Sequence, residues 1–199
     1  MADKLRIGIV GTGGIAHAHM NQYIQMDDVE IIGASDIVPG KARSFLDEFG
    51  LTNVPAFENN DELFALKPDG VSVCTYNTQH HTCACAAMEA GIHVLCEKPM
   101  TLTLEDCRAM VRAADASGKQ MMVGQISRYT PGFYKAKEMI DRGEIGELFF
   151  VESEYAHNYE KVRGTNDWRV DPLRHGFLGG GCHAVDLLRW IAGNPVETM

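Results

Sequence analysis

Short apolar runs alternate with segments of helical periodicity over about the first 125 residues. The apolar runs are rich in valine and isoleucine and end in glycine or polar residues. They predict strands at residues 5–10, 29–35, 55–57, 71–75, 93–96 and 120–124. The segments between them predict helices at residues 17–26, 40–50, 60–66, 82–90 and 104–117. Strands alternating with helices predict an α/β fold, in which a mostly parallel sheet binds its ligands at the carboxyl ends of the strands.

The pattern changes in the last third of the chain. Residues 131–142 and 182–192 predict helices, and residues 148–155 predict a strand of a second, antiparallel layer. Residues 157–177 are polar and mixed, with no clear period. We therefore expect two domains, with residues 1–125 forming the parallel sheet and residues 126–199 starting an α+β domain.

A glycine-rich turn joins the first predicted strand to the first predicted helix. Its sequence is Gly11-Thr12-Gly13-Gly14-Ile15-Ala16. In a Rossmann-type, doubly wound sheet, Gly11 makes such a turn, Gly13 lets the backbone approach a pyrophosphate, and a small residue such as Ala16 allows close helix packing. The phosphates bind N–H groups at the positive end of the helix. Taken alone, the turn also fits an ordinary βα connection.

An acidic residue ends the second predicted strand. Asp36 lies 25 residues after Gly11, near the distance of about 20 at which a carboxylate accepts hydrogen bonds from the adenosine ribose of a dinucleotide. A carboxylate there repels a 2′-phosphate, which favours NAD over NADP as the cofactor. The alternative for Asp36 is a solvated turn or helix-cap residue.

Composition and charge narrow the class of partner. The chain has 199 residues, 45% of them hydrophobic, and a formal net charge of −9. This charge disfavours nucleic acids and anionic membranes as main partners, so we expect a small-molecule ligand. We find no signal-peptide pattern and no apolar run of about 18 residues that could span a membrane. The six cysteines form no zinc-type pairs, so we expect free thiols, a cytoplasmic protein and no metal site.

Polar side chains collect after the fourth, fifth and sixth predicted strands. The three segments are Thr75-Tyr76-Asn77-Thr78-Gln79-His80, Glu97-Lys98-Pro99-Met100 and Gln125-Ile126-Ser127-Arg128-Tyr129. Because the carboxyl ends of parallel strands share one edge of a sheet, these loops predict a polar site above a bound dinucleotide.

These motifs together resemble the Gfo/Idh/MocA oxidoreductases, NAD(P)-dependent enzymes that act mainly on sugars, cyclitols and related polyols. The resemblance spans nearly the whole chain in order. It rests on residues 11–16, on Cys74-Thr75-x-Asn77-x-x-His80, on residues 90–99, on Asp167-Trp168-Arg169 and on residues 179–188. The Glu97-Lys98-Pro99 block is the most specific of these. Members of the family continue with a C-terminal sheet domain, so the resemblance implies a truncated copy or fragment and, for a longer protein, a homo-oligomer formed through that sheet.

Lys98 is the predicted acid–base residue. A nicotinamide cofactor takes the hydride, so the protein must take the hydroxyl proton. An ammonium in a partly dry pocket beside a positive ring gives up its proton more readily, and the resemblance implies the same role for this lysine. The alternative is a surface lysine that only stabilises the turn.

The resemblance also implies roles for the other site residues. His183 would face the substrate and assist Lys98, with Asp186 on the same helix face. Many members have an aspartate four residues before this histidine, where this chain has Gly179. The implied cofactor contacts are Gly11, Thr12, Gly13, Gly14, Ile15, Asp36, Thr75, Asn77, His80, Glu97, Lys98, Gln125, Trp168 and Arg169. The implied substrate contacts are Arg128, Tyr129, His157, His183 and Asp186.

Three functional hypotheses follow. The first is an NAD-dependent oxidoreductase that acts on a sugar or cyclitol hydroxyl through Lys98 and His183. The second is a dinucleotide-binding protein or fragment without turnover, which Gly179 and the early end of the chain favour. The third is NAD-dependent glycoside cleavage through a transient oxidation, which some relatives perform.

Overall fold

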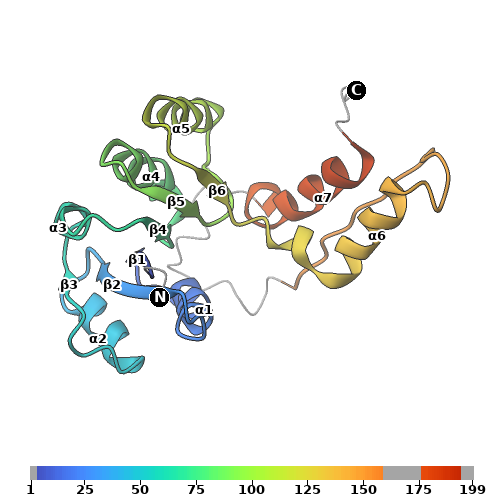
Figure 1. Ribbon diagram of the computed structural model, residues 1–199. Coiled ribbons are helices and arrows are strands. Elements are labelled where there is room, and N and C mark those ends of the chain that lie inside the picture. Colours follow the sequence, from blue (N-terminus) through green and yellow to red (C-terminus); the bar gives the residue numbers. More distant parts are fainter. Residues whose placement is uncertain (1–3, 159–175, 194–199) are drawn as a thin grey trace. The chain divides into compact units, whose positions relative to one another are not determined.

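The computed structural model describes residues 4–158 and 176–193 (Figure 1). The chain divides into two compact units, residues 1–124 and 125–199. Within the described ranges, no helix is both long and apolar enough to cross a membrane.

A six-stranded parallel sheet forms the centre of the first unit. Its strands are β1 (Leu5–Val10), β2 (Val29–Ser35), β3 (Ala56–Phe57), β4 (Gly70–Val73), β5 (His93–Cys96) and β6 (Met121–Val123). They lie in the order β3-β2-β1-β4-β5-β6, and every adjacent pair is parallel. This confirms the Rossmann-type sheet expected from the alternation of strands and helices. The chain order reverses between β1 and β4, so ligands of such a sheet bind where these two strands end.

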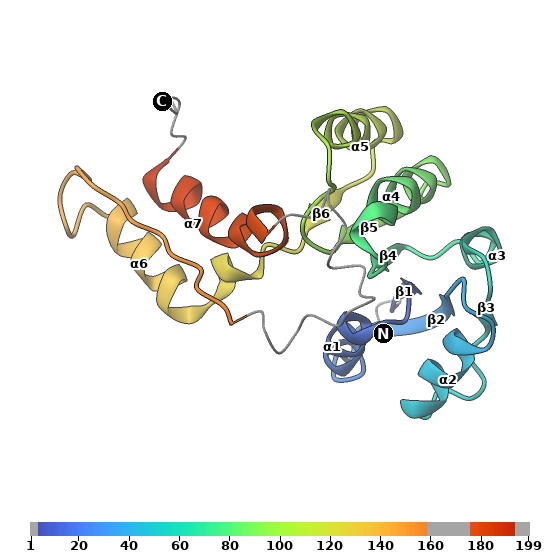
Figure 2. The ribbon, with the colours of Figure 1, turned by 180° about the vertical axis from the view of Figure 1, so that it is seen from behind.

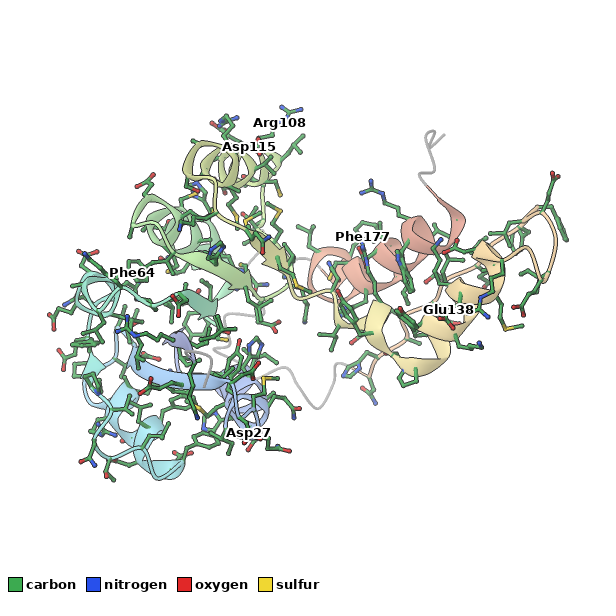
Figure 3. All side chains as sticks on the ribbon, in the orientation of Figure 1. Asp27, Phe64, Arg108, Asp115, Glu138 and Phe177 are labelled. Atoms are coloured by element: carbon green, nitrogen blue, oxygen red, sulfur yellow. The ribbon has the colours of Figure 1, made fainter. Side chains whose placement is uncertain are left out.

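Helices cover the sheet on two faces (Figure 2). The helices on one face are α1 (Gly14–Tyr23) and α2 (Lys41–Glu48), and those on the other are α3 (Asn60–Ala65), α4 (His80–Glu89) and α5 (Leu104–Ser117). Successive strand residues point to opposite faces, so Ile9 joins the core with α1 and α2, while Val10 joins the core with α3, α4 and α5. The exposed side chains of Arg108 and Asp115 project outward from α5 (Figure 3).

The ends of these helices follow from local side-chain chemistry. Thr103 caps α5 by accepting the Asp106 N–H, and the helix ends at Gly118 in the left-handed conformation. Helix α1 begins at Gly14, three residues before the predicted start. Glycine has a low helix propensity, which hid this first turn from the prediction.

The described part of the second unit contains helices. They are η2 (Ile126–Tyr129), α6 (Pro131–Asp141), the π-helical segment η4 (Phe177–Gly181) and α7 (Cys182–Ala192). The predicted strand at residues 148–155 is wrong, because this segment has no strand conformation, pairs with no strand among the described residues, and leaves Phe149 fully exposed at 101%. A strand needs a hydrogen-bonded partner strand, and the described residues of this unit supply none.

Candidate active site

The glycine turn after β1 leaves open space at the start of α1. Gly11 has φ +82°, and a Cβ there would lie 2.9 Å from the Thr75 backbone nitrogen, so the turn packs directly on the exit of β4. A Cβ on Gly13 or Gly14 would meet no neighbouring atom of the described residues within 4 Å. No side chain in the described part of the chain caps α1, and the first N–H groups of a helix lack partners within the helix. The turn therefore offers backbone donors to an anion such as a diphosphate.

Asp36 is held by four donors at the end of β2. Its Oδ2 accepts the Thr12 N–H, the Thr12 hydroxyl and the Lys41 ammonium, each at 2.9 Å, and its Oδ1 accepts the Val38 N–H at 3.0 Å. Burial would raise the pKa of the Asp36 carboxyl, but hydrogen bonds from Lys41, Thr12 and Val38 together outweigh burial and lower it. The carboxylate is thus ionised and fixed, and the Thr12 N–H is bound to it.

A cavity of about 190 Å³ adjoins this carboxylate within the first unit. Its lining includes Gly11, Asp36, Ile37, Val38 and Tyr76. Ile37 is 78% exposed and Tyr76 is 53% exposed, so an aliphatic and an aromatic side chain border the cavity beside a charged group. This combination suits a flat aromatic base linked to a sugar diol.

Two predicted residues at the exit of β4 are buried. Asn77, at the start of η1 (Asn77–Gln79), is 5% exposed. Its Nδ2 is buried and has no hydrogen-bond partner among the described residues. His80 is fully buried, with Nδ1 2.8 Å from the Pro99 carbonyl oxygen and Nε2 3.3 Å from the Thr75 carbonyl oxygen.

The His80 imidazole links the loops that follow β4 and β5. Burial lowers its pKa, although the carbonyl groups of Pro99 and Thr75 act in the opposite direction. A neutral imidazole carries one N–H, so the shorter distance assigns the proton to Nδ1, which then donates to Pro99. His80 therefore fixes the two loops that carry Asn77 and Lys98.

The Glu97-Lys98-Pro99 loop leaves β5 at the same edge of the sheet. The peptide bond between Lys98 and Pro99 is cis, and Lys98 is half-buried. Glu97 is 7% exposed, with Oε1 2.9 Å from His19 Nε2, and its Oε2 accepts the Lys98 N–H at 3.2 Å. Burial would raise the pKa of Glu97, but His19 and Lys98 outweigh it and lower the pKa. Both oxygens of the Glu97 carboxylate are thus in hydrogen-bonding contact with groups of the protein itself.

A second cluster of predicted residues lies within the second unit. His183 is 4% exposed, its Nδ1 lies 3.4 Å from the Ser127 hydroxyl, and its ring centroid lies 5.1 Å from that of Tyr155. Tyr155 also stacks on His157, with centroids 6.0 Å apart. Both His157 and His183 therefore gather around Tyr155, a residue that the sequence pattern had placed in a strand.

Arg128 and Asp186 form a two-pronged ion pair in this unit. Arg128 Nε donates to Asp186 Oδ2 at 2.7 Å, and a terminal guanidinium nitrogen donates to Oδ1 at 2.5 Å. The hydrogen bond to Asp186 raises the pKa of Arg128. Because His183 and Asp186 both contact η2, the predicted shared helix face is confirmed.

Other predicted residues differ in their surroundings. Ile15 is 43% exposed beside the glycine turn, and Tyr129 is 63% exposed. Gln125 carries a buried Oε1 that has no hydrogen-bond partner within the described ranges. Trp168 and Arg169 lie outside the described residues. Lys98 belongs to the first unit and His183 to the second.

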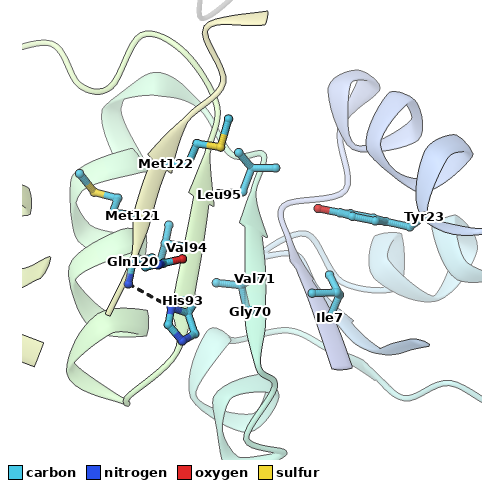
Figure 4. Close-up of a pocket in the computed structure, with 10 residues that line it drawn as sticks. All are labelled: Ile7, Tyr23, Gly70, Val71, His93, Val94, Leu95, Gln120, Met121 and Met122. Carbon is cyan, nitrogen blue, oxygen red and sulfur yellow. Dashed lines mark hydrogen bonds between the residues drawn. The ribbon is translucent and has the colours of Figure 1, made fainter. Parts of the chain in front are cut away.

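None of the six cysteines forms a disulfide within the described residues. No three His, Cys, Asp or Glu side chains come together at metal-binding distance in residues 4–158 and 176–193. A second cavity of about 460 Å³ lies on the face of the sheet and is bordered by Tyr23, Leu95 and Met122 (Figure 4). It is lined mostly by strand residues, together with Tyr23 of α1 and Gln120 before β6, whereas the loops at the carboxyl edge carry the polar groups.

Sequence reasoning missed three polar residues near these sites. His19 and Ser72 were counted as parts of a helix and a strand, although His19 contacts Glu97 and the Ser72 hydroxyl contacts His19. A serine within the apolar run Val71-Ser72-Val73 was the available signal, because a polar group at a core position needs a partner. Tyr155 carried no comparable signal.

The chain matches two family descriptions. Residues 5–125 match "Oxidoreductase family, NAD-binding Rossmann fold", and residues 133–199 match "GFO/IDH/MocA C-terminal domain". Among curated proteins, inositol 2-dehydrogenase of Salmonella typhimurium is 28% identical over 197 residues, which are 98% of this chain and 56% of that protein. Glucose-6-phosphate 3-dehydrogenase of Bacillus subtilis is 32% identical over 190 residues, which are 94% of this chain and 53% of that protein.

Solved structures give the same fold. The WlbA dehydrogenase from Bordetella pertussis, in complex with NADH and UDP-GlcNAcA, is 27% identical with a TM-score of 0.82 over 98% of this chain and 60% of that one. The myo-inositol 2-dehydrogenase from Lactobacillus plantarum is 20% identical with a TM-score of 0.86, over 96% of this chain and 57% of that one, and supports the fold alone. The chain thus spans little more than half the length of these relatives.

Proposed function

Because the chain belongs to the Gfo/Idh/MocA oxidoreductase family, we propose that it acts as an NAD-dependent dehydrogenase on a hydroxyl group of a sugar or cyclitol. The observation that carries the proposal is the open start of α1 beside the fixed carboxylate of Asp36. Relatives named as inositol and glucose-6-phosphate dehydrogenases support the class of substrate.

The first unit supplies the groups that would hold the cofactor. The backbone from Gly11 to Ile15 binds the diphosphate, and Asp36 binds the adenosine ribose. The Nδ2 of Asn77, which has no hydrogen-bond partner among the described residues, is a donor that a bound ribose hydroxyl would satisfy. Thr75, His80 and Glu97 shape the nicotinamide end. The resemblance alone assigns Gln125, Trp168 and Arg169 of the second unit to the cofactor. Asp36 favours NAD, because a 2′-phosphate would meet a negative charge.

Lys98 performs the proton chemistry in this proposal. A bound NAD would supply the acceptor for the hydride of the carbon that carries the hydroxyl. The Lys98 amine takes the proton of that hydroxyl, so that the alcohol becomes a ketone. In the second unit, His183 assists at the hydroxyl, and Arg128, Tyr129, His157 and Asp186 contact or orient the substrate. Residues 1–125 thus form the cofactor domain and residues 126–199 part of the substrate domain.

A lysine replacement tests this role. We expect Lys98→Met to lower turnover roughly 10²- to 10⁴-fold, the range for loss of a general acid–base group, while the Kd for NADH stays nearly unchanged. Turnover is followed as NADH absorbance with a panel of inositols and sugars. Lys119→Met, which removes the same charge before β6 at the opposite edge of the sheet, is the matched control. Turnover retained by Lys98→Met would refute the role.

One observation favours a second candidate, a dinucleotide-binding protein without turnover. Gly179 is buried in η4 and has no side chain where many relatives have an aspartate. NADH binding with no oxidation of any polyol would support this candidate. Glycoside cleavage is distinguished by released sugar without net NADH.

Two further proposals concern the protein in the cell. The cysteines, which form no disulfide within the described residues, support a reducing compartment, and we place the protein in the cytoplasm. A longer form of the protein would form a homo-oligomer through a C-terminal sheet.

A further inference from the structure

A chain of buried polar groups runs beneath the loop that carries Lys98. The Tyr23 hydroxyl lies 2.7 Å from the Ser72 hydroxyl, which lies 3.2 Å from His19 Nδ1. His19 Nε2 lies 2.9 Å from Glu97 Oε1, and Glu97 Oε2 accepts the Lys98 N–H. These hydrogen bonds therefore connect α1 and β4 with the backbone of the proposed acid–base residue.

The surroundings leave the Glu97 carboxylate little freedom. Its side chain is 9% exposed and that of His19 is 14% exposed, while Ser72 is fully buried. A Cβ on Gly124 would lie 3.4 Å from Glu97 Oε1, so the backbone at the end of β6 borders the carboxylate closely. A buried carboxylate needs such a partner as His19, because an unpaired charge in this position is strongly unfavourable.

One assignment of protons satisfies every hydrogen bond in this series of polar groups. If His19 donates from Nε2 to Glu97, its Nδ1 accepts from the Ser72 hydroxyl, which in turn accepts from the Tyr23 hydroxyl. Every polar group then has a partner. Figure 4 shows the Tyr23 side chain reaching from α1 toward β4, where it borders the cavity on the face of the sheet.

We infer that His19 is a positioning residue, which fixes the Glu97 carboxylate and through it the backbone of Lys98. The loop is then held on both sides, because Glu97 is bound to His19 before Lys98 and the Pro99 carbonyl is bound to His80 after it. The catalytic consequence of this arrangement rests on the proposed function, in which the Lys98 amine must meet the substrate hydroxyl. The positioning itself does not.

Two replacements of His19 test the inference. His19→Leu removes both hydrogen bonds and introduces an apolar side chain of similar size, and His19→Gln provides an amide donor toward Glu97. His81→Gln is the control, because His81 also faces a carboxylate within the first unit, Asp106 at 3.5 Å. Hydrogen exchange of the Lys98 amide, the Kd for NADH and kcat are measured on the 199-residue chain, with the urea midpoint as a check on folding.

The expected pattern separates positioning from cofactor binding. We expect the Lys98 amide to exchange about tenfold faster or more in His19→Leu, because its acceptor Glu97 is released. The kcat falls roughly 10- to 100-fold while the Kd for NADH changes little, and His19→Gln recovers part of both effects. The His81→Gln control leaves exchange and kcat within about twofold of the wild type.

Two results would overturn the inference, and a third would separate it from the proposed function. Unchanged exchange and kcat in a folded His19→Leu protein would overturn it. A Kd for NADH that rises as much as kcat falls would overturn it too, by assigning His19 and Glu97 to cofactor binding. If the wild type binds NADH but oxidises no polyol, the proposed function fails, and exchange of the Lys98 amide decides the positioning role by itself.

Discussion

Replacing Asp36 with asparagine tests the assignment of NAD to the cavity beside β2. The side chain keeps its size and loses its charge. The Asp36 Oδ2 position faces three donors, from Thr12 and Lys41, so the amide of the variant turns its oxygen toward them. Its NH₂ group then occupies the Oδ1 position, where the wild-type carboxylate accepts the Val38 N–H at 3.0 Å and has capacity for one more donor.

The expected change in the Kd for NADH follows from that single remaining acceptor site. A ribose hydroxyl that donates to an ionised carboxylate contributes about 1.5–3 kcal/mol, and the amide hydrogen cannot accept it. Loss of this bond raises the Kd for NADH about 10- to 150-fold. The Kd for NADPH rises less or falls, because the repulsion of the 2′-phosphate is removed and Lys41 loses its charged partner.

Fluorescence titration with NADH and NADPH measures both effects. Asp47→Asn is the control, because Asp47 pairs with Arg43 on α2 and its side chain is 48% exposed. An Asp36→Asn protein that is folded and binds NADH within about threefold of the wild type would refute the ribose assignment, since this corresponds to less than the weakest bond considered.

Two further predictions concern the loops at the carboxyl edge. Gly11→Ala should lower the unfolding free energy by about 2 kcal/mol or more, because of its positive φ and the Thr75 backbone 2.9 Å from the new Cβ. Gly13→Ala should leave the stability to urea nearly unchanged and still raise the Kd for NADH about tenfold or more, because the new methyl group enters the space proposed for the diphosphate. An equal loss of stability in the Gly11 and Gly13 variants would contradict this contrast. Burial lowers the pKa of His80. The contribution of His80 to the free energy of unfolding is therefore complete above the unfolded pKa of about 6.5 and is lost as the pH falls toward the folded pKa. The free energy of unfolding in urea should therefore fall less between about pH 7.5 and about pH 5.5 for His80→Gln than for the wild type. An equal fall in both proteins would assign the pH dependence to other groups.

The sequence by itself determined the parallel sheet, the glycine turn and the loops that carry polar residues. Apolar runs of valine and isoleucine, the spacing of Gly11 and Asp36 and the position of Lys98 after β5 are local features, and chain order fixes which strand each loop follows. The edge of the sheet was therefore predictable, because all strands of a parallel sheet end on the same side.

Tertiary structure decided which of these groups are already bound to the protein. Thr12 and Asp36 bind each other, and Glu97 is held by His19, a pair separated by 78 residues. Such contacts depend on the side of the sheet to which each side chain points and on which helix covers it, so periodicity alone does not reveal them. The strand expected at residues 148–155 failed for the same reason: a strand exists through its hydrogen-bonded neighbour, and a neighbour is a property of the fold.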